Sequence, residues 1–490
     1  MTLYNQQLTT SLDDLLTATQ LELKCEQIEE TIKVTLGKQQ SRGAPATSKR
    51  RMPTSETLTR LIGERRDTTC RDGATRSRLT KLIRREVRAV KRATRRSEIE
   101  SILKEYRGLQ KISGIKSYKV KDLIPSMTSA DGQTQHNRQS IADVFATFYE
   151  QLYKDSDKHN DTTQTHNENN DDRIPAFTAQ ELGKALGQLK TGKAADSNGI
   201  VAEMLKAGGH TLREVLLNLY NAITQPSSPS PNNWHHTIIK VLHKSGPPQL
   251  PQNYRPIATI PILYKLFARL LYNRLEPTLD KQQSCDQAGF RRERGTTNHL
   301  FTISMLQEIS DEWQIPLWVA AVDFKKAFDS VTHSAIWRAL SEQGVSPSYI
   351  QLLNKLYNNQ TASVKTDTRS RLFNIERGTK QGDPLSSLLF NCVSESVMRQ
   401  TKLKWNSKHW GVPLQPHHTD NTQLTNLRFA DDLLLVATSL EHLKQMIGDL
   451  SMEASRVGLQ LHPDKTKILH NQATRRKPQP KHVNIKSLSI

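Results

Sequence analysis

The sequence predicts an α+β fold in which a basic, mainly helical N-terminal region precedes an antiparallel sheet with helices on one face. Residues 317–322 form an apolar run of strand length, and the pattern SAIWRALSEQGV that follows is helical. LTNLRFADDLLLVATS places two apolar strands around a tight Ala-Asp-Asp turn, which predicts a β-hairpin. Leu79, Ile83, Val87 and Val90 recur at helical spacing within a strongly basic segment.

The composition indicates a polyanionic partner. The 490 residues include 69 Lys and Arg against 49 Asp and Glu, a formal net charge of +20. Nucleic acid is the first candidate for this partner, an anionic membrane surface is the second, and a merely basic soluble protein is the plain alternative. The N-terminus lacks the pattern of a secretory signal, and no apolar run is long enough to span a bilayer. We therefore expect a protein that is not secreted and has no membrane partner.

Composition along the chain divides it into four parts. Residues 1–125 are a basic, mainly helical region, 126–172 a polar linker, 173–470 the main domain with its core at 235–470, and 471–490 a basic tail. Arginines crowd the polar faces of the basic helix: Arg84, Arg85, Arg88, Arg92, Arg95 and Arg96. These arginines predict contact with nucleic-acid phosphates, although a solvated surface helix explains the segment nearly as well.

Three aspartates carry the candidate chemistry. Asp323 follows the apolar run directly, and Asp431 and Asp432 occupy the predicted hairpin turn. Each position alone has a plain explanation, because aspartates often cap helices or form turns. Together they suit phosphoryl transfer, in which two Mg²⁺ ions ~3.5–4 Å apart are held by carboxylates and substrate phosphates. His and Cys constellations typical of zinc enzymes are absent from the sequence.

The motifs and their order resemble one polymerase family. VDFKKAFDSV resembles the first catalytic motif of reverse transcriptases, and FADD resembles their paired-aspartate motif. RGTKQGDPLSSLLFNCVSESVM resembles the template and nucleotide loop with its following helix, and GLQLHPDKTKIL a downstream lysine motif. LHKSGPPQLPQNYRPIATIPILYKLFARLL and QAGFRRERGTTNHL resemble motifs of the fingers. From about residue 192 to 469, the order is most similar to reverse transcriptases of non-LTR (LINE-like) retrotransposons, which implies a right-hand polymerase with fingers and palm and makes residues 471–490 a basic tail or a thumb remnant.

The resemblance implies a role for each matching residue. Asp323, Asp431 and Asp432 would be metal ligands and catalytic residues, with the Phe324 carbonyl assisting. Phe328 would be a steric gate that favours dNTPs over rNTPs, with a plain core aromatic as its alternative. The remaining roles are triphosphate binding by Arg291, contact with the template–nucleotide pair by Gln381 and Gly382, and proton donation to pyrophosphate by Lys465.

The function implied is RNA-directed DNA polymerisation in retrotransposition. Mg²⁺, with Mn²⁺ as an alternative, would be the cofactor, and template RNA, primer or target DNA and dNTPs would be the partners. A truncated copy without its endonuclease domain, in a nuclear and cytoplasmic ribonucleoprotein, is the form we expect. Two alternatives stay open: a catalytically weak or inactive retroelement remnant that binds RNA, and an intron maturase-like protein. An RNA-dependent RNA polymerase fits Phe328 less well.

Overall fold

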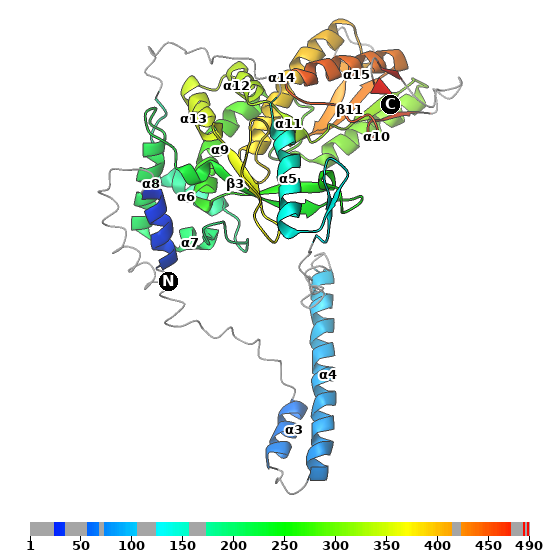
Figure 1. Cartoon of the computed structure of the whole chain (residues 1–490). Helices are drawn as coiled ribbons and strands as arrows, with labels where there is room; N and C mark the ends of the chain where they lie inside the picture. Colours follow the sequence, from blue (N-terminus) through cyan, green and yellow to red (C-terminus); the bar gives the residue numbers. More distant parts are fainter. Residues whose placement is uncertain are drawn as a thin grey trace. The chain divides into compact units, whose positions relative to one another are not determined.

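The computed structural model describes residues 24–34, 56–67, 73–104, 124–155, 173–413, 423–471, 484–485 and 488–489. The chain divides into a smaller unit, Leu36–Leu123, and a larger unit that combines Met1–Thr35 with Ile124–Ile490 (Figure 1). Within the described residues, no helix has the length and apolar character needed to cross a membrane.

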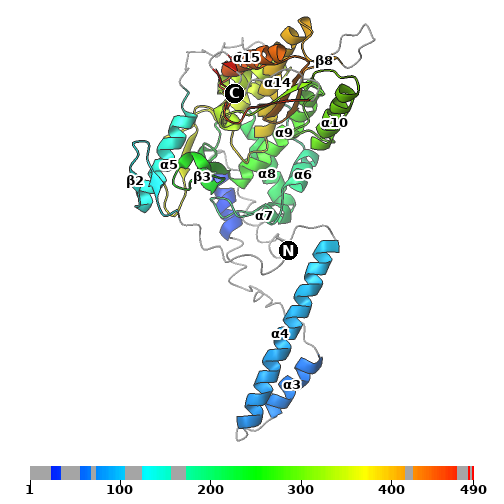
Figure 2. The ribbon, with the colours of Figure 1, turned by 90° about the vertical axis from the view of Figure 1, so that its right-hand side faces the viewer.

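The smaller unit contains two helices that pack side by side, α3 (Glu56–Asp67) and α4 (Gly73–Lys104) (Figures 1 and 2). Leu58, Leu61 and Leu79 are buried. The predicted basic helix is therefore confirmed as a helix. The side chains of four of its arginines are exposed: Arg84, Arg85, Arg88 and Arg92. The side chains of Arg95 and Arg96 lie outside the described part.

The palm sheet, as we call it, lies in the larger unit and has the order β10-β11-β5-β12. Its strands are β5 (Trp318–Val322), β10 (Asn426–Phe429), β11 (Asp432–Ala437) and β12 (Lys467–His470). Every neighbouring pair is antiparallel. Helix α15 (Leu440–Ser455) packs on β5 and β11, and α14 (Ser386–Ser407) packs on α15. The predicted α+β fold with an antiparallel sheet is thus confirmed.

The fingers sheet, as we call it, has the order β4-β3-β6-β7. Its strands are β3 (His236–His243), β4 (Tyr254–Thr259), β6 (Thr361–Val364) and β7 (Phe373–Asn374). Strands β3 and β6 are parallel, and the other two pairs are antiparallel. The sheet therefore joins segments from both sides of β5 in the sequence.

The predicted linker at 126–172 is wrong over its first half. Residues 127–153 form the short hairpin β1 (Met127–Thr128) and β2 (Thr134–Gln135), followed by α5 (Arg138–Tyr153). Helix α5 buries Phe145 and Tyr149 in one core cluster with Ile239 and Tyr254 of the fingers sheet. Its apolar face makes it part of the larger unit despite the polar residues around it. Residues 156–172 lie outside the described part.

Helices fill the rest of the larger unit. They are residues 24–34, α6 (Ala179–Gln188), α7 (Ala202–Ala207), α8 (His210–Ile223), η3 (Asn232–Trp234), η4 (Pro251–Asn253), α9 (Ile262–Gln282), α10 (Thr296–Glu312), α11 (Ala327–Ser330), α12 (His333–Glu342) and α13 (Pro347–Tyr357). Buried Glu29 accepts hydrogen bonds from Asn198 and Asn233, so the N-terminal helix belongs to this unit rather than to the basic region.

Two further strand pairs complete the larger unit. They are β8 (Val412–Pro413) with β9 (Gln423–Leu424), and β13 (Asn484–Ile485) with β14 (Leu488–Ser489). Strand β13 contacts α15, and Ile485 is buried. This part of the predicted tail at 471–490 therefore folds onto the larger unit.

Candidate active site

The three aspartates meet at one end of the palm sheet. Strand β11 pairs with β5 so that Leu433 lies opposite Val322. The next position along this antiparallel register places Asp432 opposite Asp323. The β10–β11 hairpin pairs Phe429 with Asp432, which leaves Ala430 and Asp431 as the two residues of the turn. The register of one sheet thus brings together Asp323 and Asp431, which lie 108 positions apart in the sequence.

The site concentrates negative charge. Burial raises the pKa of the Asp431 carboxyl, and the charges of Asp432 and Asp323 add to this rise, although a backbone hydrogen bond and Lys244 oppose it. Oδ2 of Asp323 is buried and accepts no hydrogen bond, and it lies 3.3 Å from Nζ of Lys465. These carboxylates repel one another, and Oδ2 of Asp323 has the Lys465 ammonium beside it but no hydrogen bond, so a divalent cation would stabilise their arrangement.

The arrangement fits a divalent ion held by few protein ligands. Among the described residues, no group of three or more His, Cys, Asp or Glu side chains is placed to hold a metal ion. Asp432 is exposed and, as the residue opposite Asp323, lies on the same face of the sheet as that aspartate. The predicted ligand set of Asp323, Asp431 and Asp432 stays a prediction. Mg²⁺ is usually bound by one or two carboxylates plus substrate phosphates, which these aspartates would satisfy.

Lys465 reaches the site through a short extension of the palm sheet. The Lys325 amide donates to the Gln460 carbonyl at 2.8 Å, and the His462 amide donates to the Asp323 carbonyl at 2.7 Å. Phe324 and Leu461 form an antiparallel β-bridge between these two hydrogen bonds. The Phe324 carbonyl accepts neither of the two hydrogen bonds. The sheet extension thus explains why the predicted lysine lies beside the first aspartate.

Phe328 lies beside the loop that was predicted to contact the nucleotide. Its half-buried ring stacks on Phe390, with 4.4 Å between the ring centroids, and meets the exposed Phe290 edge-on at 6.1 Å. Its carbonyl accepts a hydrogen bond from the Thr379 amide at 2.7 Å. The gate role stays a prediction, and the ring is held in place for it from two sides.

Gln381 and Gly382 connect the palm to the fingers. The Gln381 side-chain amide donates to the two carboxylate oxygens of Asp329 at 3.2 and 3.4 Å. The backbone carbonyl of Gln381 accepts a hydrogen bond from the Ala258 amide of β4 at 3.1 Å. Gly382 is exposed with φ 113°, a left-handed conformation that favours glycine. The predicted contact with the template–nucleotide pair stays a prediction, while the side chain of Gln381 is occupied by Asp329.

Arg291, predicted to bind the triphosphate, makes hydrogen bonds within the protein in this structure. Its guanidinium donates to the Asp280 carboxylate at 2.6 and 3.2 Å and to the backbone carbonyls of Asp280, Ser284 and Gln287, and its side chain is only 8% exposed. These contacts occupy the guanidinium hydrogen-bond donors with which an arginine would bind a triphosphate. Arg291 therefore anchors the end of α9 to the following loop, and its triphosphate contact stays a prediction that would require some of these hydrogen bonds to be exchanged.

The sequence prediction overlooked three charged residues near the aspartates. The positive charge of Lys244 lowers the pKa of Asp431. Lys326 has the left-handed φ of 45°, and its ammonium lies 4.8 Å from the Phe148 ring centroid. Burial lowers the pKa of Lys326, and the positive charges of Lys244 and Lys465 lower it further, against the effect of Asp329. Burial raises the pKa of Asp329 to about 6. The Lys326–Asp329 pair in KKAFD was the signal available from the sequence.

Comparisons with known proteins agree with this geometry. Over 208 residues the chain is 29% identical to "Retrovirus-related Pol polyprotein from type-1 retrotransposable element R2" of Popillia japonica, covering 42% of this chain and 28% of that protein. Over 305 residues it is 25% identical to "Probable RNA-directed DNA polymerase from transposon BS" of Drosophila melanogaster, covering 60% and 32%. The chain thus spans about a third or less of the length of these relatives.

One solved structure, apo telomerase from Candida tropicalis, aligns with a TM-score of 0.39 and 14% identity, covering 58% of this chain and 52% of that one. The family model "Reverse transcriptase (RNA-dependent DNA polymerase)" matches residues 242–488, which contain the palm sheet, strands β4, β6 and β7 of the fingers sheet, and all three aspartates. The resemblance to non-LTR retrotransposon enzymes is confirmed by the R2 relatives. With the motifs, the palm sheet and half of the sequence in agreement, the chain belongs to the reverse transcriptase family.

Proposed function

We propose that this chain is an RNA-directed DNA polymerase that adds dNTPs to a DNA 3′ end on an RNA template and releases pyrophosphate. The observation that carries this proposal is the meeting of Asp323 with the Asp431–Asp432 turn at one end of the palm sheet. Membership of the reverse transcriptase family supports it.

Asp323, Asp431 and Asp432 would hold the divalent cations, Mg²⁺ or Mn²⁺. When bound, such ions lower the pKa of the primer 3′-hydroxyl and stabilise the charge of the leaving pyrophosphate. The Oδ2 of Asp323, which accepts no hydrogen bond, and the burial and repulsion that raise the pKa of Asp431 support this assignment. Catalysis would come mostly from positioning and electrostatics.

Lysines supply the positive charge that the triphosphate needs. Lys244, Lys326 and Lys465 influence one another or the aspartates electrostatically, so they lie around the same site. They would add to the positive charge predicted from Arg291. Lys465 would deliver a proton to the pyrophosphate, which its 56% exposed side chain and its ammonium beside Asp323 support. Phe328 would exclude the ribose 2′-hydroxyl.

The basic face of α4 would bind nucleic-acid phosphates, and this would hold even for a catalytically inactive protein. Primer extension therefore separates polymerisation from RNA binding alone. On an RNA template with a DNA primer, dNTPs and Mg²⁺, we expect extension by the wild type and none by Asp431→Asn, with RNA binding retained. The same substitution at the exposed Asp311 should leave extension unchanged. Normal extension by Asp431→Asn would overturn the catalytic assignment, and RNA binding without extension by the wild type would favour the remnant.

A further inference from the structure

Ala430 and Asp431 form the turn between β10 and β11, which we call the catalytic turn. Its backbone conformation is one that these residues do not favour. Ala430 adopts φ 61°, although it is not a glycine. A left-handed alanine brings its Cβ close to neighbouring backbone, so this conformation persists only where surrounding contacts impose it. The next residue is Asp431, so the backbone at Ala430 sets the direction in which this carboxylate points.

A segment from the fingers side of the chain supplies these contacts. Residues 286–288 run beside β10 with a parallel bridge between Gln287 and Arg428. The Arg428 amide donates to the Asp286 carbonyl at 2.7 Å, and the Ala288 amide donates to the Arg428 carbonyl at 2.9 Å. This pairing ends two residues before the turn and brings the Gln287 side chain to it.

Gln287 bonds the turn directly. Its side-chain carbonyl Oε1 accepts hydrogen bonds from the Ala430 amide at 3.1 Å and from the Gly289 amide at 2.8 Å. The side chain is fully buried, with 0% exposure. One oxygen therefore ties the left-handed residue of the turn to the 286–289 segment, where water does not compete.

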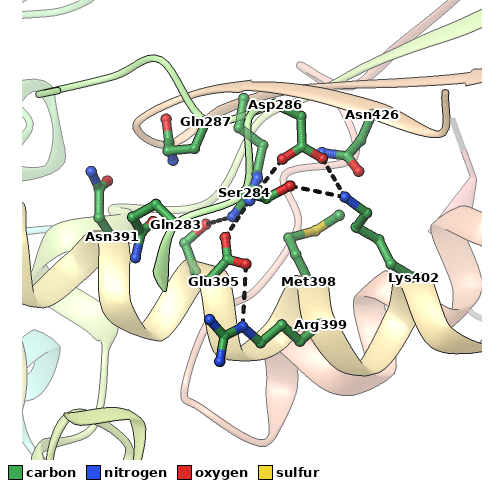
Figure 3. Close-up of polar contacts among 12 residues, drawn as sticks. Gln283, Ser284, Asp286, Gln287, Asn391, Glu395, Met398, Arg399, Lys402 and Asn426 are labelled. Carbon is green, nitrogen blue, oxygen red and sulfur yellow. Dashed lines mark hydrogen bonds and ion pairs between the residues drawn. The ribbon is translucent and has the colours of Figure 1, made fainter. Parts of the chain in front are cut away.

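Close backbone packing fixes the same contact from the other side. A Cβ on Gly289 would lie 2.1 Å from the Ala430 nitrogen, so only a glycine allows this approach. The Asn391 side-chain amide of α14 holds the Gly289 carbonyl at 2.9 Å. In Figure 3, Asn391 and Lys402 project from α14 on the side of the helix where Gln287 and Asp286 lie. The ion pair between Lys402 and Asp286 anchors the segment to this helix.

We propose that Gln287 is a positioning residue for the catalytic turn: its side-chain carbonyl fixes the left-handed Ala430 and thereby holds Asp431 toward Asp323. The residue touches neither substrate nor metal and acts through the backbone of the turn. The proposal rests on the proposed polymerase function only in its kinetic consequences, because the orientation of the two aspartates also governs cation binding.

The test compares Gln287→Met with Gln343→Met in the full chain. Methionine keeps the volume and removes the accepting oxygen. Gln343 is a matched control, since its side chain is also buried and donates to the Cys392 carbonyl at 2.8 Å without contacting the turn. The readouts are the affinity for Mn²⁺ alone by electron paramagnetic resonance, hydrogen exchange of the Ala430 amide, and kcat and KM for dNTPs in primer extension.

For Gln287→Met we expect faster exchange at Ala430, about tenfold weaker Mn²⁺ binding, and kcat reduced by about 100-fold with little change in KM, as for a small displacement of a catalytic group. Gln343→Met should match the wild type in all of these. If Gln287→Met does not fold, Gln287→Asn, which keeps the amide but shortens its reach, should give the same pattern.

Equal Mn²⁺ affinity and equal exchange at Ala430 in the Gln287 variants and the wild type would overturn the proposal. A wild type that binds Mn²⁺ but extends no primer would instead refute the polymerase function, and the Mn²⁺ and exchange measurements would still decide the role of Gln287.

Discussion

The Arg428→Met substitution should destabilise the larger unit by about 3–5 kcal/mol, because it leaves two buried carboxylates without their shared cation. Nη2 of Arg428 lies 3.1 Å from Oδ1 of Asp286 and also bonds Glu395. The three side chains are 1%, 6% and 4% exposed, in the order Arg428, Asp286 and Glu395. A loss of this size is a large part of the stability of a typical domain, about 5–15 kcal/mol.

The pH dependence gives the prediction a second part. Burial alone would raise the pKa of Asp286, but Arg428 and Lys402 outweigh it and hold this pKa at about 2, below its ordinary value of 3.8. The folded pKa is below the unfolded one, so this stabilisation of about 2 kcal/mol is complete above pH 3.8 and is lost as the pH falls toward 2. Without Arg428 the folded pKa rises. The gap in stability between wild type and variant should therefore narrow from pH 7 to pH 3.

The measurement is urea denaturation followed by tryptophan fluorescence at pH 7, 4 and 3, the last of which lies within the pKa range of about 2 to 3.8. Arg371→Met is the control, since Arg371 pairs with Glu150 at 2.6 Å while both side chains are more than 40% exposed. Removing such a surface pair should change stability by less than about 1 kcal/mol. The reasoning fails if Arg428→Met resembles this control at pH 7, or if its deficit grows in acid.

Two further predictions concern the palm. Burial raises the pKa of Asp329 from 3.8 to about 6, although Lys326, Tyr153 and Gln381 oppose the rise, so the native state keeps a proton that the unfolded chain has lost. Stability should therefore decline by about 3 kcal/mol as the pH rises through this window, and Asp329→Asn should abolish the decline; a flat wild-type curve of Tm against pH would contradict this. Phe328→Ala should lower the preference for dNTPs over rNTPs in kcat/KM by about tenfold or more, and an unchanged ratio in primer extension would remove the gate role.

The parts predicted correctly depend on local patterns. The apolar run before Asp323 and the two strands around Asp431 determine their own secondary structure, and antiparallel pairing then leaves little freedom in where the aspartates meet. Helix α5 was missed because its surroundings are polar on average. Its buried residues Phe145, Tyr149 and Tyr153 recur every fourth position, and this periodicity was the better signal.

Partner choice among polar side chains could not be predicted in the same way. The motif around Arg291 indicates a guanidinium near the nucleotide, but the structure shows Asp280 at the end of α9 as its partner. Lys244 precedes Asp431 by most of the domain and comes near it only through the packing of the fingers on the palm. Which cation faces the site is a tertiary property, so a motif can identify the region without assigning the residue.

The catalytic turn itself goes against local preference. A two-residue hairpin whose first central residue has positive φ ordinarily carries glycine there, yet this turn has Ala430, followed by two aspartates that repel each other. A left-handed alanine costs roughly 1–2 kcal/mol. The compensating contact comes from Gln287, 143 residues earlier. Strain that persists because distant contacts impose it is typical of functional sites. The letters FADD therefore identify the chemistry, while the geometry that makes it effective depends on a segment that no local pattern connects to them.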